Sequence, residues 1–513
     1  MAVWRRLLPT ITVIMGVIAK QSIRGTIVTY LGAAISVVTT FCVMTRFLTA
    51  EEIGLTRVLV DAGTLFIGLA QLGTTSSIVR FYPYFKTDDR RDHGFFFWTV
   101  VVPFVGFLVV ACCFFLLRGQ ITAMFEEKSA LFVNYFYYVL PLAFFMLYQT
   151  VFETNVNVRM RIVFPRAVRE VLVRVLLLLL YLLYAFRVLT LDGFVMSLCC
   201  IYAVAALLNL IYLFSTGRVS LTPDMLFLRD NAGLVRKYLL YTCFLILSAL
   251  ASVFAPLISG FFVSAKMGLD YNGIFAIAVN MAALVCIPSR SLNAIASPEL
   301  SQTFKEDDRQ HRAVLLKQVS SNLFLIGSLI LLAIWINIDL IFHILPNGGV
   351  YSTARSTVLL LSVSQLLLSS FSIGLLAINY SRYYYYSLIC SVLLTFSTIL
   401  LNQLLIPVCG ITGAALANCL SYVLFFICVL VVIKVFLHTS PLSLSHLKTL
   451  VAGALVFTLN ELMSRFLPDM NIWLSSALRS VVLIGSFLIV AWLWNISPDI
   501  KNMVRRKLHG HAG

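Results

Sequence analysis

Charged residues are scarce in this chain, and their scarcity excludes a soluble globular protein. Only 12% of the 513 residues are Asp, Glu, Lys or Arg, whereas roughly a quarter are charged in a typical soluble domain. Hydrophobic residues make up 60% of the sequence, and the mean hydropathy is +0.95. A chain of this composition cannot cover its surface with groups that water solvates, so we expect most of that surface to face lipid.

Acidic residues are the scarcest charged class. The 22 Asp and Glu residues stand against 38 Lys and Arg, which gives a formal net charge of +16. In a soluble chain this excess would suggest nucleic-acid binding, but membrane proteins concentrate Lys and Arg in their cytoplasmic loops. The charge therefore needs no nucleic-acid partner, and we expect none.

The sequence also lacks the patterns of metal sites and of catalytic sites. Two of its cysteine pairs, Cys112–Cys113 and Cys199–Cys200, are adjacent in apolar runs, and no CxxC or Cys/His spacing occurs. P-loop, HExxH and GxSxG motifs are absent as well. We expect a protein that is not an enzyme and holds no metal or cofactor, so any driving force comes from an H⁺ or Na⁺ gradient or from substrate flux.

Long apolar runs are what the sequence has instead. Each run has about 20 residues, enough for one helix to cross a bilayer, and the runs do not alternate in the way that barrel strands do. The prediction is an all-α integral membrane protein with about 14 transmembrane helices. The predicted spans are 24–46, 56–81, 95–117, 131–152, 168–186, 194–215, 238–264, 272–297, 319–345, 356–379, 384–406, 410–436, 448–467 and 472–495.

Positive charge falls mainly on alternate loops. With a cytoplasmic N-terminus, the inner loops include the basic segments 86–91, 159–166 and 305–317, while the outer loops hold only scattered positive residues. Cytoplasmic loops are the basic ones in multi-pass proteins, so both termini are expected inside. Residues 1–22 are read as an interfacial helix and residues 497–513 as a basic cytoplasmic tail.

An internal repeat links the two halves of the chain. The sequence FKTDDR at 85–90 recurs as FKEDDR at 304–309, a spacing of 219 residues, although so short a match between charged loops could also arise by chance. Six predicted helices separate the copies, so both cross the membrane in the same direction. We expect two pseudo-symmetric six-helix lobes with the substrate path between them. The N-lobe then spans 23–217 and the C-lobe 218–437, and 438–496 adds two further helices.

Polar residues line one side of the second predicted span. Steps of three and four residues place them on one helical face, as expected for the wall of a polar path. A buried ion pair between Arg57 and Asp61, one turn apart, is the alternative interpretation. Asp61 is also the deepest candidate for binding H⁺ or Na⁺. The polar-path residues predicted in this span are Thr64, Gln71 and Thr75.

The remaining intramembrane charges are mostly arginines. The repeat spacing aligns Asn280 with Asp61 and Arg290 with Gln71. Asn280 and Asn293 are predicted to belong to the polar path as well, whereas Arg290 could instead extend to the headgroups. Arginine forks match phosphate oxygens, so a cationic cavity for an anionic headgroup is predicted. Its candidate residues are Arg24, Arg46, Arg57, Arg80, Arg174 and Arg290.

Three segments carry a family resemblance. Residues 45–55 (TRFLTAEEIGL) fit the pattern R-x-L-x-x-x-x-x-G, residues 73–82 (GTTSSIVRFY) resemble the segment that follows it, and residues 406–415 (IPVCGITGAA) fit P-x-x-G-I-x-G-A-A. The chain thus resembles the multidrug/oligosaccharidyl-lipid/polysaccharide (MOP) superfamily, above all its O-antigen and capsule flippases.

The resemblance implies two lobes that rock between inward-open and outward-open states, and a lipid-linked oligosaccharide on undecaprenyl pyrophosphate as substrate. It also implies a bacterial inner-membrane protein, expected to act as a monomer among membrane lipids beside the polymerase and glycosyltransferases of its pathway. The two extra helices resemble those of lipid II flippases, so lipid II is an alternative substrate. The same sequence also leaves room for a drug/cation antiporter, for a scramblase, and for a membrane glycosyltransferase or polymerase.

Overall fold

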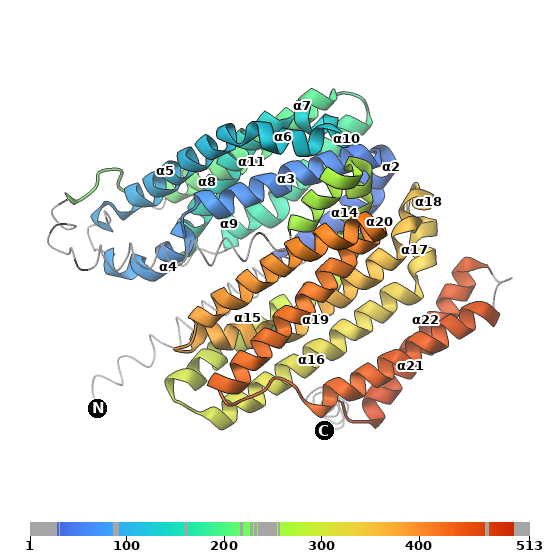
Figure 1. Cartoon of the computed structure of the whole chain (residues 1–513). Helices are drawn as coiled ribbons and strands as arrows, with labels where there is room; N and C mark the ends of the chain where they lie inside the picture. Colours follow the sequence, from blue (N-terminus) through green and yellow to red (C-terminus); the bar gives the residue numbers. More distant parts are fainter. Residues whose placement is uncertain are drawn as a thin grey trace, which may run out of the picture. The chain divides into compact units, whose positions relative to one another are not determined.

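The computed structural model describes residues 28–29, 31–85, 92–159, 163–215, 219–225, 229, 233, 254, 257–466 and 471–496. Within these ranges the chain is helical, and eight helices are long and apolar enough to cross a membrane (Figure 1). Leu31–Phe47 and Leu257–Met267 are shorter apolar helices. The predicted all-α membrane fold is confirmed.

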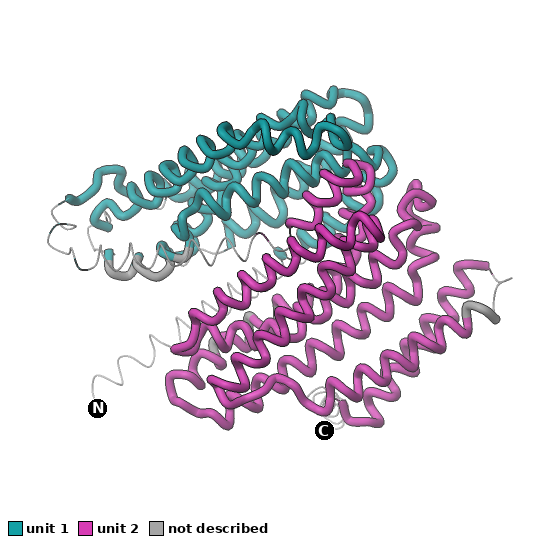
Figure 2. Tube along the Cα trace, in the orientation of Figure 1, with its two compact units in different colours: residues 1–253 teal, residues 254–513 magenta. Residues whose placement is uncertain are grey.

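The chain divides into two compact units, residues 1–253 and 254–513 (Figure 2). The predicted lobe boundary at 217/218 stays a prediction, as do the interfacial segment 1–22 and the tail 497–513, which lie outside the described ranges. The elements of unit 1 are η1 Thr39–Met44, α2 Thr45–Phe47, α3 Ala50–Ala70, α4 Thr74–Phe85, η2 Asp92–Gly94, α5 Phe95–Leu116, α6 Arg118–Glu126, α7 Ala130–Asn134, η3 Phe136–Tyr138, α8 Val139–Asn157, α9 Val163–Ala167, η4 Val168–Leu172, α10 Val173–Ala185 and α11 Leu191–Ser215.

Unit 2 repeats this order and then adds two helices. Its elements are α14 Leu269–Ala283, η5 Leu284–Cys286, α15 Ile287–Lys305, α16 Arg309–Ile336, α17 Ile338–Ile344, α18 Gly348–Tyr351, η6 Ser352–Ala354, α19 Arg355–Tyr380, α20 Tyr385–Phe436, α21 Leu444–Phe466 and α22 Ile472–Leu493. Each predicted span falls largely on these elements and the shorter helix Leu31–Phe47, except 238–264, of which only the end, from Leu257, is described.

The 219-residue spacing of the sequence repeat recurs in the helix boundaries. Both α3 and α14 begin at positions related by this spacing, Ala50 and Leu269, and α4 and α15 end within one residue of it, at Phe85 and Lys305. The short pair α6–α7 likewise corresponds to α17–α18. Since helix boundaries agree over stretches whose sequences differ, the spacing reflects a duplicated arrangement and not a chance match of two charged loops.

The second predicted span is interrupted. One continuous helix over 56–81 was expected, but α3 ends at Ala70 and α4 begins at Thr74. Leu72 and Gly73 adopt φ values of 46° and 67°, which a helix cannot contain. The polar residues of this span therefore share one helical face only as far as Gln71, and the prediction that the same face continues to Thr75 was wrong.

A sharp turn divides α20 into the two helices that the sequence predicted. At Gly410 the backbone has φ 59° and ψ −137°, a region that is essentially open only to glycine. The chain then runs back along itself, because Cys390 and Cys428 approach to 3.2 Å and Tyr386 stacks on Phe436 at 4.4 Å. In Figure 1 the halves appear as two orange helices side by side.

The last two helices pack on α16. Leu332 and Ile336 of α16 contribute to one buried apolar cluster with Ala452 and Val456 of α21 and Phe487 of α22. Polar contacts reinforce this cluster: the Asn337 side chain exchanges hydrogen bonds with the Ser480 hydroxyl at 2.8 and 3.0 Å. Trp335 Nε1 donates to Glu461 Oε1 at 3.2 Å. Because lipid tails are as apolar as these side chains, close packing and hydrogen bonds are what hold the helices together.

Candidate functional site

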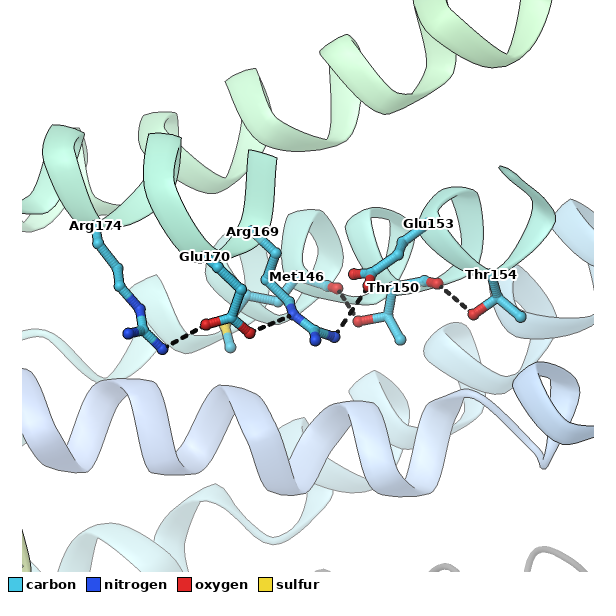
Figure 3. Close-up of polar contacts among 7 residues, drawn as sticks. All are labelled: Met146, Thr150, Glu153, Thr154, Arg169, Glu170 and Arg174. Atoms are coloured by element: carbon cyan, nitrogen blue, oxygen red, sulfur yellow. Dashed lines mark hydrogen bonds and ion pairs between the residues drawn. The ribbon is translucent and has the colours of Figure 1, made fainter. Parts of the chain in front are cut away.

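A row of four charged side chains lies in unit 1, on the consecutive elements η4 and α10 and on the neighbouring helix α8 (Figure 3). Arg169 of η4 contacts two carboxylates: its Nη1 lies 3.0 Å from Glu153 Oε1 of α8, and its Nε donates to Glu170 Oε1 at 3.2 Å. The other oxygen of Glu170 accepts from Arg174 Nη2 of α10 at 2.6 Å. The order along the row is Glu153, Arg169, Glu170, Arg174, so the charges alternate.

The two kinds of charge differ in burial. The carboxylate side chains of Glu153 and Glu170 are 8% and 9% exposed, whereas those of Arg169 and Arg174 are 49% and 24% exposed. Buried carboxylates thus fix the guanidinium groups from one side and leave part of each accessible. A guanidinium carries five N–H donors, so the exposed part of each arginine can donate to an anion. This row can therefore present two oriented cations to a phosphate group.

Local helix geometry brings Glu170 into the row. Residues Val168–Leu172 form a π-helical turn, a feature that often marks functional positions because it shifts the following side chains around the helix axis. The turn lies against the first apolar helix, where Gly32 is buried. A Cβ at Gly32 would stand 2.1 Å from the main-chain oxygen of Glu170, so this close approach depends on glycine.

Asp61 has an arginine partner. Arg57 Nε donates to Asp61 Oδ2 at 2.8 Å, and the two side chains are 30% and 10% exposed. An ion pair one turn apart, the alternative interpretation of this spacing, is what the structure shows. Arg57 and Arg174 are consequently both paired with carboxylates and are not isolated cations of the cavity.

The other predicted arginines are spread over the fold. Arg46 is exposed on α2, where its Cζ lies 5.6 Å from the centre of the Phe47 ring. Arg290 is exposed on α15. Arg24 lies outside the described residues, and Arg80 lies on α4 with its side chain outside them. These four remain predictions.

The predicted polar-path residues are half-buried and partly satisfied within their own units. Thr64 donates to the Val60 carbonyl at 2.8 Å, and Thr75 donates to Gln71 Oε1 at 3.2 Å across the break between α3 and α4. Asn293 donates to the Ser372 hydroxyl of α19 at 2.7 Å. Asn280 is half-buried on α14. Only Gln71 and Thr75 are brought together.

Arg169 and Glu170 were not predicted from the sequence. The sequence does contain an indication of them. The segment 168–174 (VREVLVR) places three charges within two turns of an apolar span, where charges are rare and usually functional. A second buried pair was also missed. Arg159 Nη2 lies 3.6 Å from Asp92 Oδ2, with side chains 5% and 2% exposed, and Tyr82 donates to the same oxygen at 3.2 Å. The described residues include no cluster of His, Cys, Asp and Glu that could hold a metal ion.

Comparison with known proteins places this arrangement in a family. The model of the polysaccharide biosynthesis proteins matches residues 18–304, whereas no curated protein sequence matches the chain. Among solved structures, the lipid II flippase MurJ in an inward closed conformation is 12% identical, with a TM-score of 0.72 over 92% of this chain and 98% of its own. An inward-facing multidrug resistance MATE family transporter of the MOP superfamily is 14% identical, with a TM-score of 0.62 over 78% of this chain and 93% of its own.

A MOP superfamily transporter from Pyrococcus furiosus is 16% identical, with a TM-score of 0.52 over 82% of this chain and 97% of its own. At these identities the solved structures establish a common fold, and the family model, which covers more than half of the chain, establishes the lineage. The chain belongs to the polysaccharide biosynthesis protein family.

Proposed function

We propose that this protein is a flippase that moves an undecaprenyl-pyrophosphate-linked oligosaccharide, such as an O-antigen, capsule or exopolysaccharide repeat unit, from the inner to the outer leaflet by alternating access. The charged row in unit 1 carries the proposal. Buried charges in a transmembrane helix are costly and mark substrate or ion paths, and the accessible donors of this row belong to Arg169 and Arg174.

The proposed mechanism follows from the chemistry of these groups. Arg169 and Arg174 donate to the pyrophosphate oxygens in charge-assisted hydrogen bonds, while Glu153 and Glu170 hold both guanidinium groups in place. Arg24, Arg80 and Arg290 capture the headgroup at the inner side. The glycan follows the polar residues, and the lipid tail stays among the membrane lipids. A proton or Na⁺ that binds Asp61 competes with Arg57, so the state of this pair couples the cycle to an ion gradient.

The cellular setting is part of the same proposal. The protein resides in the bacterial inner membrane with both termini in the cytoplasm, acts as a monomer, and works beside the polymerase and glycosyltransferases of its pathway. It has no nucleic-acid partner and no cofactor.

A lipid II-type substrate is the second candidate. The observation in its favour is the extent of the similarity to the flippase MurJ, which covers 92% of this chain and therefore extends beyond the twelve helices of the repeat, which are predicted to end at residue 437. A cation antiporter is disfavoured, because the buried carboxylates Asp61, Glu153 and Glu170 each have an arginine partner, so these sites carry no excess negative charge to attract a cationic drug.

Deletion and complementation test the function. Cells without the gene should accumulate lipid-linked oligosaccharide at the inner leaflet and lose the surface polysaccharide, and the wild-type gene should restore it. R169Q combined with R174Q should fail to restore export at normal protein levels. R187Q, which removes one positive charge from an exposed turn of unit 1, should restore it.

Two outcomes would change the assignment. Accumulation of lipid II, or a cell-wall defect in place of the loss of surface polysaccharide, would move it to the second candidate. Normal export by the R169Q/R174Q variant would remove the charged row from the mechanism.

A further inference from the structure

A polar pocket lies at one end of unit 2, remote in sequence from the charged row of unit 1. Its volume is about 390 Å³, which is within the usual range of small-molecule sites. Three chain turns meet around it: the α15–α16 turn, the α19–α20 turn and the α20–α21 turn. By the charge distribution of the sequence all three are cytoplasmic loops, so this is the end of the unit predicted to face the inner leaflet.

The pocket is lined by an excess of cationic groups. Arg309 and Arg312 lie at the start of α16, directly after the first of these turns, whereas Arg382 lies in the second turn and His438 in the third. Asp307 is the one carboxylate among the lining residues. That carboxylate is 75% exposed, and its Oδ1 lies 3.9 Å from Arg309 Nε and 3.8 Å from Arg312 Nη2. At these separations and in contact with water, Asp307 neutralises its neighbours only weakly.

Arg312 is the residue that points most directly to a ligand. Its side chain is 4% exposed, yet its Nε has no hydrogen-bond partner among the described residues. Its Nη1 has only a long contact of 3.4 Å to the Thr303 carbonyl, and the Phe304 ring covers the guanidinium at 4.3 Å. A buried polar group without a partner is costly, and a buried charge more so. An anion in the pocket would remove that cost.

The equivalent end of unit 1 shows what a structural arginine looks like in this fold. There Arg159 is buried to the same degree, but its counter-ion Asp92 is buried as well, so a carboxylate of the protein itself balances the buried charge. Arg312 lacks a buried carboxylate within ion-pair distance among the described residues. The two units therefore differ in the source of the counter-ion. In unit 1 it is the buried carboxylate of Asp92, and in unit 2 a ligand in the pocket could take its place.

We propose that this pocket binds a phosphate group through Arg309, Arg312 and Arg382, at a second site that is separate from the transported substrate. The guanidinium group matches phosphate oxygens in a bidentate geometry. The Tyr383 hydroxyl, which accepts from Arg382 Nη2 at 2.6 Å, orients one of the three guanidinium groups. The phosphate belongs either to the headgroup of an anionic inner-leaflet lipid or to a soluble phosphate compound. The pocket has the same chemistry for both.

Binding to the full-length protein in nanodiscs tests the site and separates the two sources. In phosphatidylcholine nanodiscs, inorganic pyrophosphate is titrated by calorimetry. In a second arm, retention of phosphatidylglycerol is measured by native mass spectrometry after exchange from mixed nanodiscs. We expect the wild type to bind at least one probe, and R309Q combined with R382Q to weaken that binding by about tenfold or more, as for lost charge-assisted hydrogen bonds.

The variants are chosen so that folding does not decide the outcome. Arg309 and Arg382 are exposed, and R312K retains the buried charge while it removes the fork. K317Q on α16 removes an exposed positive charge that does not line the pocket and should leave binding unchanged. Binding of pyrophosphate alone would identify a soluble ligand, and binding of phosphatidylglycerol alone a lipid. Binding of neither probe by the wild type, or equal binding by wild type and R309Q/R382Q, would overturn the proposal.

Discussion

Arg57 Nε donates a hydrogen bond to Asp61 Oδ2, one turn further along α3, across 2.8 Å. Asp61 as a whole residue is 7% exposed, and without its partner the carboxylate would be an unpaired buried charge, which is strongly unfavourable. The pair is also reversible, because a proton or Na⁺ at Asp61 would release Arg57. The Arg57–Asp61 contact thus stabilises the fold and, in the proposed cycle, couples transport to an ion gradient. Measurements of stability and of gradient-dependent transport distinguish these two roles.

Neutralising one partner should destabilise the protein, and neutralising both should not. D61N leaves Arg57 without its counter-ion, and we expect a loss of about 2 kcal/mol, below the usual range for a broken buried pair because Arg57 is partly exposed. R57Q combined with D61N should recover most of that loss. Scanning fluorimetry of the purified variants measures the effect, and a double variant as unstable as D61N would contradict a stabilising pair.

Coupling has its own readout. In proteoliposomes, flipping of a fluorescent lipid-linked saccharide by the wild type should respond to an imposed H⁺ or Na⁺ gradient. R57Q/D61N should flip at a rate that no gradient changes, because it has no carboxylate at this position. R187Q, with its exposed charge removed, serves as the control. If the double variant responds to the gradient as the wild type does, the coupling ion binds elsewhere.

Much of the fold was predictable from the sequence because bilayer thickness fixes the length of an apolar span. The spans at 95–117, 194–215 and 472–495 agree closely with α5, α11 and α22, and the repeat at 85–90 and 304–309 indicated the duplication. The break at Leu72–Gly73 was not predicted, since apolar and small residues continue through it and only their backbone angles reveal it.

The site was less predictable than the fold, because pairing between helices has no signature in one sequence. The i, i+4 pair of Arg57 and Asp61 could be anticipated from spacing alone. Glu170 and Arg174 have the same i, i+4 spacing and could have been anticipated in the same way. Contact between Glu153 and Arg169 depends on how α8 packs beside η4, and that packing does not follow from helical periodicity.

Gly32→Ala should disrupt the charged row without touching a charge. A methyl group there would lie 2.1 Å from the Glu170 carbonyl oxygen, so the first apolar helix or the π-turn must move. We expect export to fall severely, together with a lower melting temperature. Gly453→Ala is the matched control, since a Cβ at Gly453 meets nothing within 4 Å, and helix propensity favours alanine by up to about 1 kcal/mol. Wild-type export by Gly32→Ala would show that the close approach is dispensable.

The turn in α20 explains the glycines of the segment 406–415 and makes them testable. Gly410 has a backbone conformation restricted to glycine, and a Cβ at Gly413 would lie 2.2 Å from the Leu405 carbonyl oxygen. Alanine at Gly410 should cost about 1–3 kcal/mol of backbone strain, and alanine at Gly413 should separate the two halves of the hairpin.

Cysteine cross-linking reports on that hairpin. The Sγ atoms of Cys390 and Cys428 lie 3.2 Å apart, so an oxidant should form a disulfide between the two halves of the hairpin in the wild type. In Gly413→Ala we expect this disulfide to form less completely. The reduced cysteines of a C390S variant provide the blank. Equal cross-linking in wild type and Gly413→Ala would mean that the hairpin tolerates the added methyl group.

Phe487→Ala tests whether the last two helices act in transport or only brace unit 2. Phe487 is fully buried in the cluster that joins α22 to α16 and α21, and its removal should leave a cavity that costs about 3 kcal/mol. Ile489→Ala, on the exposed side of the same helix at 61% exposure, should cost little because lipid replaces the lost contacts. If these helices only brace the unit, Phe487→Ala lowers the melting temperature while the flipping rate per folded molecule in proteoliposomes stays at the wild-type value. A lower rate in molecules that remain folded would instead assign α21 and α22 a part in the transport cycle, and it would do so without any change to a polar or charged side chain.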